Sequence, residues 1–152
     1  MASWKQQALI AAPVPDVWGI LSDPERGPDW DPDLMAVTGA PTKIEKGSTF
    51  DLTARGPLGL TNTTTFRVEE LEDMHELKVK CQMSGFYAHW LLTPAQDGTF
   101  TEVELGIEPI EARTVKGRVG AALHTKSYLR REVEKLLDGL RRTVSRDHAT
   151  AP

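Results

Sequence analysis

The segment from Gly117 to Arg146 constrains the fold more than any other, because it has the pattern of one long amphipathic helix. On a helical wheel of about 3.6 residues per turn, its apolar residues gather on one side. They are Val119, Ala122, Leu129, Val133, Leu136, Leu137, Leu140 and Val144. Most charged residues of the segment fall at the flanks or opposite, so the helix is expected to pack one face against the rest of the protein.

This apolar face is uneven along its length. Its second half carries leucines, whereas its first half carries Gly120, Ala121 and Ala122, so we expect free volume beneath the first half. Lys126 lies near the middle of the apolar face. Its ammonium either reaches the rim of the protein along the aliphatic stem or serves as a polar anchor inside a cavity.

Seven segments before this helix have strand character, most clearly residues 75–84, where Leu77, Val79 and Cys81 alternate with charged neighbours. We place these strands at residues 3–11, 34–39, 48–55, 60–71, 75–84, 86–93 and 99–110. A short helix is expected after Pro13, because prolines are tolerated before and within a first helical turn.

The segment 86–93 is apolar on both faces, so its pattern leaves two registers open. The favoured register turns the even-numbered residues, including Trp90, toward the interior. A shift by one residue would instead turn Tyr87 and His89 inward and bring a candidate acid/base pair into the interior.

The order of elements predicts an α+β fold. Successive strands with short turns form antiparallel pairs. A sheet whose apolar face stays uncovered until the last element must bury that face on the last helix. We therefore expect a curved antiparallel sheet of six to seven strands wrapped around the C-terminal helix, with one or two short helices after the first strand. Residues 1–146 are expected to form a single domain and residues 147–152 a flexible tail.

Composition narrows the function classes. The chain has 18 basic and 22 acidic residues, and its basic excess lies only in the last segment, which is typical of a solvated helix face and argues against nucleic-acid binding. No stretch is long or apolar enough to span a membrane, and the apolar run 8–14 is too short for a secretory signal. We expect a cytoplasmic monomer or homodimer.

Metal and cofactor motifs are lacking. Alternating aspartates in the Pro28–Asp33 loop resemble a calcium loop, but Leu34 and Ala40 occupy the positions that need glycine and glutamate. The four histidines show no helical zinc spacing, and the single cysteine, Cys81, fits a small core residue better than a nucleophile. We expect no metal and no cofactor, and the catalytic residues, if there are any, stay unidentified.

Several short motifs lie along the chain in a recognisable order. They are Ile10-x-Ala12-Pro13-x-x-x-Val17-Trp18, Leu21-x-Asp23-Pro24, Trp30, Gly98-Thr99 and the closing amphipathic helix. With the element order, they resemble the START-like or Bet v 1-like (SRPBCC) superfamily, and within it the polyketide cyclase/dehydrase and lipid-transport group. The resemblance implies the helix-grip fold and an internal cavity for apolar ligands between sheet and long helix. It implies no catalytic residue.

Four polar residues fall on the predicted inner face of the sheet: Asn62, Thr64, Glu70 and Thr101. Each would cost on the order of 1–3 kcal/mol if buried without a partner. Glu70 lies near a strand end and is expected to reach solvent, so Asn62 and Thr64 are the better cavity candidates.

The predicted strand faces place a set of residues around this cavity. The expected ligand-binding residues are Trp30, Phe50, Leu52, Asn62, Thr64, Phe66, Val79, Cys81, Met83, Trp90, Ala122 and Lys126, with Trp30 and the turn 56–59 at the mouth. A mostly apolar wall with a few polar groups suits a small molecule, and aromatic walls favour a ring-containing one.

Three functions fit this interpretation. The first is a protein that binds or carries a hydrophobic small molecule, lipid-like or polyketide-like. The alternative is an aromatase/cyclase-type enzyme that folds a polyketide-like substrate in the same cavity and moves a proton. The third is a protein-interaction module of the cochaperone kind, which would have a filled core and an exposed apolar patch.

Overall fold

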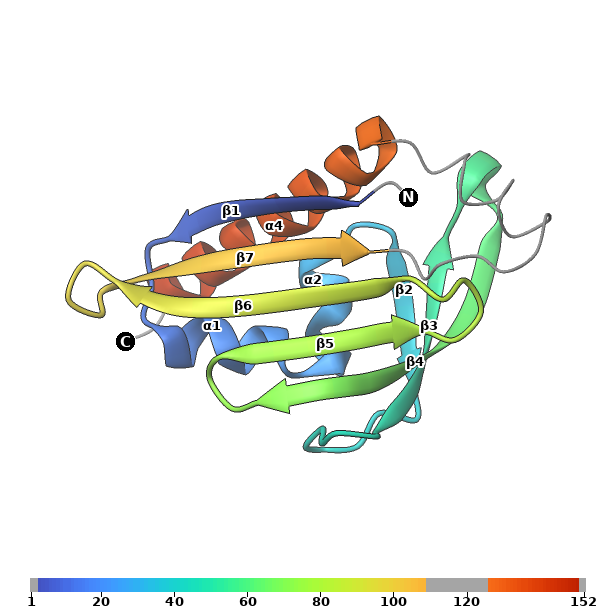
Figure 1. Ribbon diagram of the computed structural model, residues 1–152, viewed down its shortest axis with the longest axis horizontal. Coiled ribbons are helices and arrows are strands. Elements are labelled where there is room, and N and C mark those ends of the chain that lie inside the picture. Colours follow the sequence, from blue (N-terminus) through green and yellow to red (C-terminus); the bar gives the residue numbers. More distant parts are fainter. Residues whose placement is uncertain (1–2, 109–125, 151–152) are drawn as a thin grey trace.

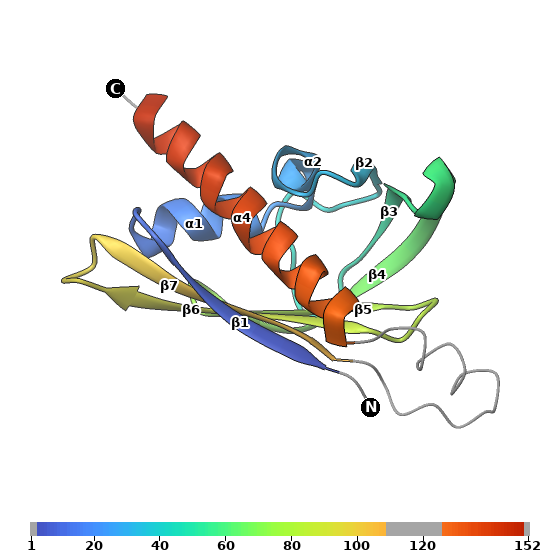
Figure 2. The same cartoon turned by 90° about the horizontal axis from the view of Figure 1, so that it is seen from above.

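The computed structural model describes residues 3–108 and 126–150. Seven strands form one sheet, and the described helices cover one of its faces (Figures 1 and 2). In chain order the elements are β1 (Trp4–Ile10), α1 (Val14–Leu21), the 3-10 turn η1 (Pro24–Arg26), α2 (Gly27–Trp30), β2 (Leu34–Thr38), β3 (Thr49–Arg55), the 3-10 turn η2 (Pro57–Gly59), β4 (Thr61–Glu72), β5 (Glu76–Cys81), β6 (Tyr87–Ala95), β7 (Phe100–Glu108) and α4 (Lys126–Thr150).

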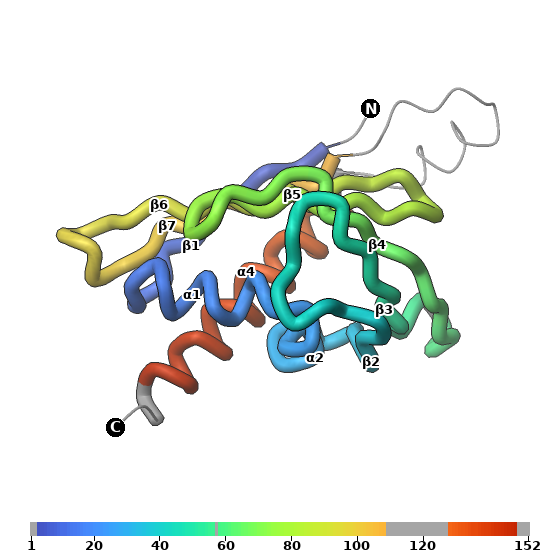
Figure 3. The backbone as a smooth tube through the Cα atoms, turned by 90° about the horizontal axis from the view of Figure 1, so that it is seen from below, coloured from blue at the N-terminus to red at the C-terminus, as the bar shows by residue number. Residues whose placement is uncertain are grey.

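The sheet has the order β1-β7-β6-β5-β4-β3-β2, and all of its neighbouring strands are antiparallel. It is curved, and seen from below its β2–β3–β4 end folds over toward α2 (Figure 3). Register irregularities at Val68/Glu70 in β4 and at Leu34/Ala36 in β2 lie in this folded end. Such bulges bend a strand and increase its twist. The predicted α+β fold, a curved antiparallel sheet around a C-terminal helix, is confirmed.

The inner face of the sheet carries the predicted apolar residues. In β7, Val103 and Leu105 are fully buried. In β6, Trp90 is 3% exposed and Leu92 is fully buried. The favoured register of β6 is therefore confirmed. The alternative register is wrong, because both of its residues lie on the opposite face. Nε2 of His89 is 2.7 Å from Oε2 of Glu76 in β5, and the ring centroid of Tyr87 is 4.6 Å from Nζ of Lys78.

One apolar seam of α4 closes the core from the other side. Leu129, Val133, Leu137, Leu140 and Val144 are each at most 3% exposed, as the helical periodicity predicts. Full burial of an aliphatic side chain is worth roughly 1.5–3 kcal/mol, so this seam is a large share of the core. The glycine- and alanine-rich first half predicted for this helix, with Ala122, lies outside the described residues. Among the described helices, none is both long and apolar enough to cross a bilayer.

Helix α4 ends later than predicted. It continues to Thr150, so the expected end at 146 is wrong and residues 147–150 are helical. Nη2 of Arg26 donates to Oδ2 of Asp147 at 2.7 Å, and Nδ1 of His148 lies 3.3 Å from Oδ2 of Asp16 in α1. These contacts join residues that are far apart in the sequence, so no local sequence pattern predicts them.

Strand β5 ends earlier than predicted, at Cys81 instead of residue 84. The N–H of Gly85 donates to the carbonyl of Cys81 at 2.8 Å, which closes a turn over the intervening residues. Met83 therefore lies in a turn and is 65% exposed, so its predicted position on the inner face is wrong. The alternation that suggested a longer strand continued by chance into the turn.

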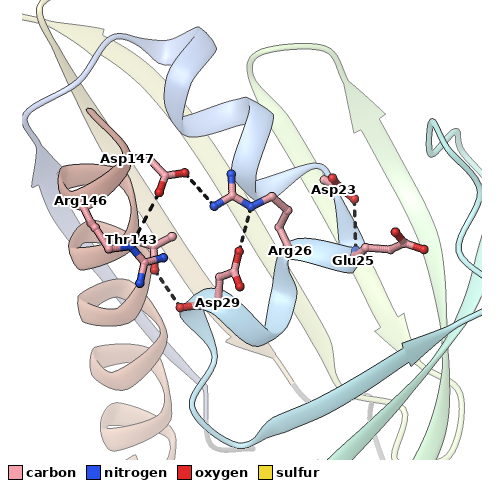
Figure 4. Close-up of polar contacts among 7 residues, drawn as sticks. All are labelled: Asp23, Glu25, Arg26, Asp29, Thr143, Arg146 and Asp147. Carbon is pink, nitrogen blue, oxygen red and sulfur yellow. Dashed lines mark hydrogen bonds and ion pairs between the residues drawn. The ribbon is translucent and has the colours of Figure 1, made fainter. Parts of the chain in front are cut away.

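A close contact fixes α2 against α4. The hydroxyl of Thr143 donates to the carbonyl oxygen of Asp29 at 2.9 Å, and Arg26 bridges Asp29 and Asp147 (Figure 4). Between them, Gly139 brings the two backbones together: a Cβ at this position would overlap the carbonyl oxygen of Trp30 and lie 3.0 Å from its carbonyl carbon. Only glycine leaves room for α2 at this point, and α2 in turn holds Trp30.

We expect Gly139→Ala to lower the free energy of unfolding by roughly 1–3 kcal/mol, because the added methyl group must push α2 away from α4. Denaturant unfolding of the two proteins measures the difference. The matched control is Gly19→Ala in α1, where no heavy atom lies within 4 Å of the new Cβ. That exposed helical change should raise stability by up to about 1 kcal/mol. Equal stability of Gly139→Ala and the parent would contradict the close approach of the two helices.

Candidate functional site

A pocket of about 380 Å³ lies between the sheet and the N-terminal part of α4. Its floor is the inner face of β3 to β7, and its other walls come from α4 and from the segment that runs from the end of α1 to β2. We call it the helix–sheet pocket. Its apolar and aromatic lining consists of Leu21, Trp30, Leu34, Ile44, Phe50, Leu52, Phe66, Leu77, Val79, Cys81, Phe86, Tyr87, Ala88, Trp90, Ile107, Tyr128, Leu129 and Leu136.

Two aromatic pairs shape the walls. Trp30 meets Trp90 edge to face, with ring centroids 5.5 Å apart and planes at 85°. Phe50 of β3 stacks on Phe66 of β4 with centroids 6.5 Å apart, since these residues are direct cross-strand partners. Trp90 and Phe50 are buried and Trp30 and Phe66 are partly buried, so the paired rings give the pocket flat aromatic surfaces.

The indole N–H of Trp30 is a buried donor with no acceptor among the described residues. An unpaired buried donor costs roughly 1–3 kcal/mol. The contact of α2 with Gly139 holds the backbone of Trp30 in place, so the indole has little freedom to seek solvent. A bound molecule or a water molecule with an acceptor atom would satisfy this donor.

A polar group borders the pocket where α4 faces the α2–β2 connection. Lys135 donates to Asp33 and, at 2.9 and 3.0 Å, to both carboxylate oxygens of Glu132. Oδ1 of Asp31 accepts the backbone N–H of Asp33 at 3.0 Å. We call Asp31, Asp33, Glu132 and Lys135 the acidic edge. Two of its members, Asp31 and Glu132, line the pocket.

Burial perturbs the titration of this edge. It raises the pKa of the Asp31 carboxyl above its ordinary value of 3.8, and the hydrogen bond from Asp33 only partly offsets this. Burial also raises the pKa of Tyr128, with a further contribution from the negative charge of Glu132. For Lys135, burial lowers the pKa, but the hydrogen bonds to Asp33 and Glu132 outweigh it, so its pKa is raised. Carboxyl groups whose pKa is raised by burial inside a cleft are frequent at functional sites.

Seven of the twelve residues named from the sequence lie around the pocket. They are Trp30, Phe50, Leu52, Phe66, Val79, Cys81 and Trp90. Asn62 is exposed, with its amide 3.8 Å from the sulfur of Met83, and neither residue lines the pocket. Thr64, also in β4, is partly exposed and does not line the pocket either. Ala122 and the side chain of Lys126 lie outside what the structure describes.

The other inner polar residues have structural roles. Thr101 is fully buried, and its hydroxyl donates to the carbonyl of Ala12 at 2.8 Å, so it ties β7 to the connection between β1 and α1. Glu70 reaches solvent as expected and pairs with Lys46 at 3.2 Å. The turn 56–59 was expected at the mouth, but none of its described side chains lines the pocket.

Sequence reasoning missed Asp31, Tyr128 and Glu132. A signal was present for two of them: Tyr128, Glu132 and Leu136 recur at intervals of four residues, beside the seam that starts at Leu129. Residues four apart lie on the same helix face, so this second stripe faces the pocket while the first seals the core. The sequence carries no such signal for Asp31, because its position depends on the contact between α2 and α4.

The aspartates of the 28–33 loop take separate partners. Asp29 pairs with Arg26 at 2.9 Å, Asp33 pairs with Lys135, and Asp31 caps the N–H of Asp33. Among the described residues, no three His, Cys, Asp or Glu side chains are arranged to hold a metal ion.

Comparisons with known proteins bear on the whole chain. A family model described as polyketide cyclase / dehydrase and lipid transport matches residues 1–145. No curated protein sequence matches significantly. Among solved structures, the Zhui aromatase/cyclase from Streptomyces sp. R1128 superposes with a TM-score of 0.76 at 17% identity, covering 95% of this chain and 94% of that one.

Two further structures are similar over nearly their full length. The protein TTHA0849 from Thermus thermophilus has a TM-score of 0.74 and 17% identity, with 99% of this chain and 100% of that chain covered. A START superfamily protein from Mycobacterium smegmatis has a TM-score of 0.73 and 14% identity, with coverages of 95% and 97%. At these identities the likeness shows the helix-grip fold alone.

The raised pKa of Asp31 predicts a pH-dependent stability difference. The folded protein binds the Asp31 proton more tightly than the unfolded chain does, so this group's contribution to stability falls as pH rises from 3.8 through the folded pKa. We expect Asp31→Asn, which keeps an acceptor for Asp33, to be more stable than the parent at pH 7 and to lose this advantage below pH 3.8. Denaturant unfolding at several pH values measures it. A parent that is the more stable protein at pH 7 would contradict it.

Proposed function

The chain belongs to the polyketide cyclase/dehydrase and lipid transport family, and on that premise we propose that it binds or carries a hydrophobic, ring-containing small molecule in the helix–sheet pocket. The observation that carries the proposal is the pocket itself. Its aromatic pairs, Trp30 with Trp90 and Phe50 with Phe66, surround a volume of about 380 Å³. Small-molecule sites commonly have volumes of roughly 300–1,000 Å³ and such predominantly apolar walls.

The size and polarity of the pocket support a compact ligand. A volume near the lower end of the usual range suits a molecule of two or three fused rings better than a long-chain lipid. The N–H of Trp30, which has no acceptor among the described residues, supports a ligand with an acceptor atom, such as a carbonyl or hydroxyl oxygen. Apolar contact would supply affinity, at roughly 25 cal/mol for each Å² removed from water, and the indole N–H would orient the ligand.

A second candidate is an enzyme of the aromatase/cyclase type that acts on a polyketide-like substrate. The observation that favours it is Asp31, a carboxyl on the pocket wall whose pKa is raised by burial. A carboxyl of this kind can hold or move a proton on a bound substrate. Loss of turnover in Asp31→Asn with retained binding of a neutral ligand would distinguish this candidate from a carrier.

The binding proposal predicts that the full-length protein binds N-phenyl-1-naphthylamine, a neutral apolar fluorophore, at one molecule per chain. Binding should raise the probe's fluorescence and change tryptophan emission, because Trp30 and Trp90 form part of the wall. We expect Ala88→Trp, which places a large ring in the pocket, to weaken binding by about tenfold or more, equal to about 1.4 kcal/mol.

The matched control is Ala36→Trp, which adds the same ring at an exposed position of β2 outside the pocket lining and should leave affinity unchanged. Thermal unfolding of both variants checks that they fold. A parent that fails to bind this probe would contradict the proposal and favour the protein-interaction alternative, for which the exposed Leu58 and Leu60 offer an apolar surface.

A further inference from the structure

Among the described residues, the charged side chains that line the helix–sheet pocket are all acidic. Its charged lining residues are Asp23, Asp31 and Glu132, and within the described residues no lysine, arginine or histidine lines it. The rest of the lining is almost entirely apolar or aromatic. Because charges beside a low-dielectric wall interact more strongly than charges in water, this asymmetry should discriminate between ligands of different charge.

Lys135, the one cation of the acidic edge, does not balance its carboxylates. Lys135 is engaged by Asp33 and by both oxygens of Glu132. With all groups ionised, the acidic edge carries the negative charges of Asp31, Asp33 and Glu132 and the positive charge of Lys135. The acidic edge itself therefore keeps a net negative charge, and Lys135 directs its donors to Asp33 and Glu132.

Asp31 has acceptor capacity left on the pocket wall. One of its oxygens accepts the N–H of Asp33, and no residue within the described ranges donates a hydrogen bond to the other oxygen. Burial raises the pKa of this carboxyl, which means that its ionised form has lost hydration without gaining a full substitute. A cationic group in the pocket would supply that substitute.

Aromatic rings stand beside the same edge. Trp30 directly precedes Asp31 in the chain, and Tyr128 lies one helical turn before Glu132, and all four residues line the pocket. Faces of tryptophan and tyrosine attract cations, by about 0.5–2 kcal/mol depending on solvation. Carboxylates together with aromatic rings are a combination that suits an organic ammonium.

We propose that the helix–sheet pocket selects ring-containing ligands that carry a protonated amine, which pairs with Asp31 and Glu132 while the rings pack among the aromatic walls. The same edge rejects ligands that carry a carboxylate, because it repels a negative charge and offers no free cation among the described side chains. This inference rests on the proposed function, since it names the ligand class of the same pocket.

Three ligands with the same ring test the proposal: 1-naphthylmethylamine, which is cationic at pH 7, 1-naphthylmethanol, which is neutral, and the carboxylate of 1-naphthaleneacetic acid. Each is titrated at pH 7 against the full-length protein by calorimetry or by displacement of N-phenyl-1-naphthylamine. We expect the amine to bind about tenfold or more tightly than the carboxylate, with the alcohol between them. Addition of salt should reduce the difference in affinity between the amine and the carboxylate.

Asp31→Asn should bring the affinities of amine and alcohol close together and leave that of the alcohol unchanged. A second variant, Glu132→Gln, should likewise weaken the binding of the amine relative to the alcohol. The matched control is Asp97→Asn, which removes one negative charge from the exposed β6–β7 turn and should preserve the amine preference.

A carboxylate that binds as tightly as the amine, or an amine preference that survives both pocket variants, would overturn this inference. Binding of the neutral probe would then still support the proposed function. If neither the neutral probe nor any naphthyl ligand binds, the proposed function fails together with the inference.

Discussion

The burial of one seam of α4 against the inner face of the sheet is the interaction on which the rest of the structure depends. Without the helix, a seven-stranded sheet would expose Val103, Leu105 and Leu92, and none of these is accessible once α4 and α1 are in place. A sheet with one apolar face needs such a cover, and the hydrophobic effect supplies the driving force.

The helix performs two tasks with two adjacent stripes. The seam from Leu129 to Val144 seals the core, and the stripe of Tyr128, Glu132 and Leu136 lines the helix–sheet pocket together with Leu129. This division explains how a pocket persists inside a small domain, where interiors otherwise pack to near-crystalline density. The pocket lies where α4, α2 and the curved end of the sheet diverge. The contact of Gly139 with the backbone of Trp30 fixes the position of α2 beside it.

Proteins with 17% identity share this fold because the fold depends on patterns more than on particular residues. Alternating strands, a seam at helical spacing and short turns can be met by many sequences. The groups around the pocket are not constrained in this way. The fold does not dictate Asp31, Glu132 or the rings beside them, so the proposed function of this chain is argued from these residues and not from the fold.

The sequence by itself determined the strands, the described part of the covering helix, the inner face of most strands and seven residues around the pocket, since periodicity reports which side of an element meets the core. It misplaced Met83, since alternation carries no mark of where a strand turns, and Asn62, since an inner face extends beyond the pocket. Only the tertiary structure decided that Asp31 borders the pocket and that α4 reaches Thr150. The place of Asp31 depends on the approach of α2 to α4 at Gly139, and the last turn of α4 is held by contacts of Asp147 and His148 with segments near the other end of the chain. No local pattern of polarity encodes such contacts between segments far apart in the sequence.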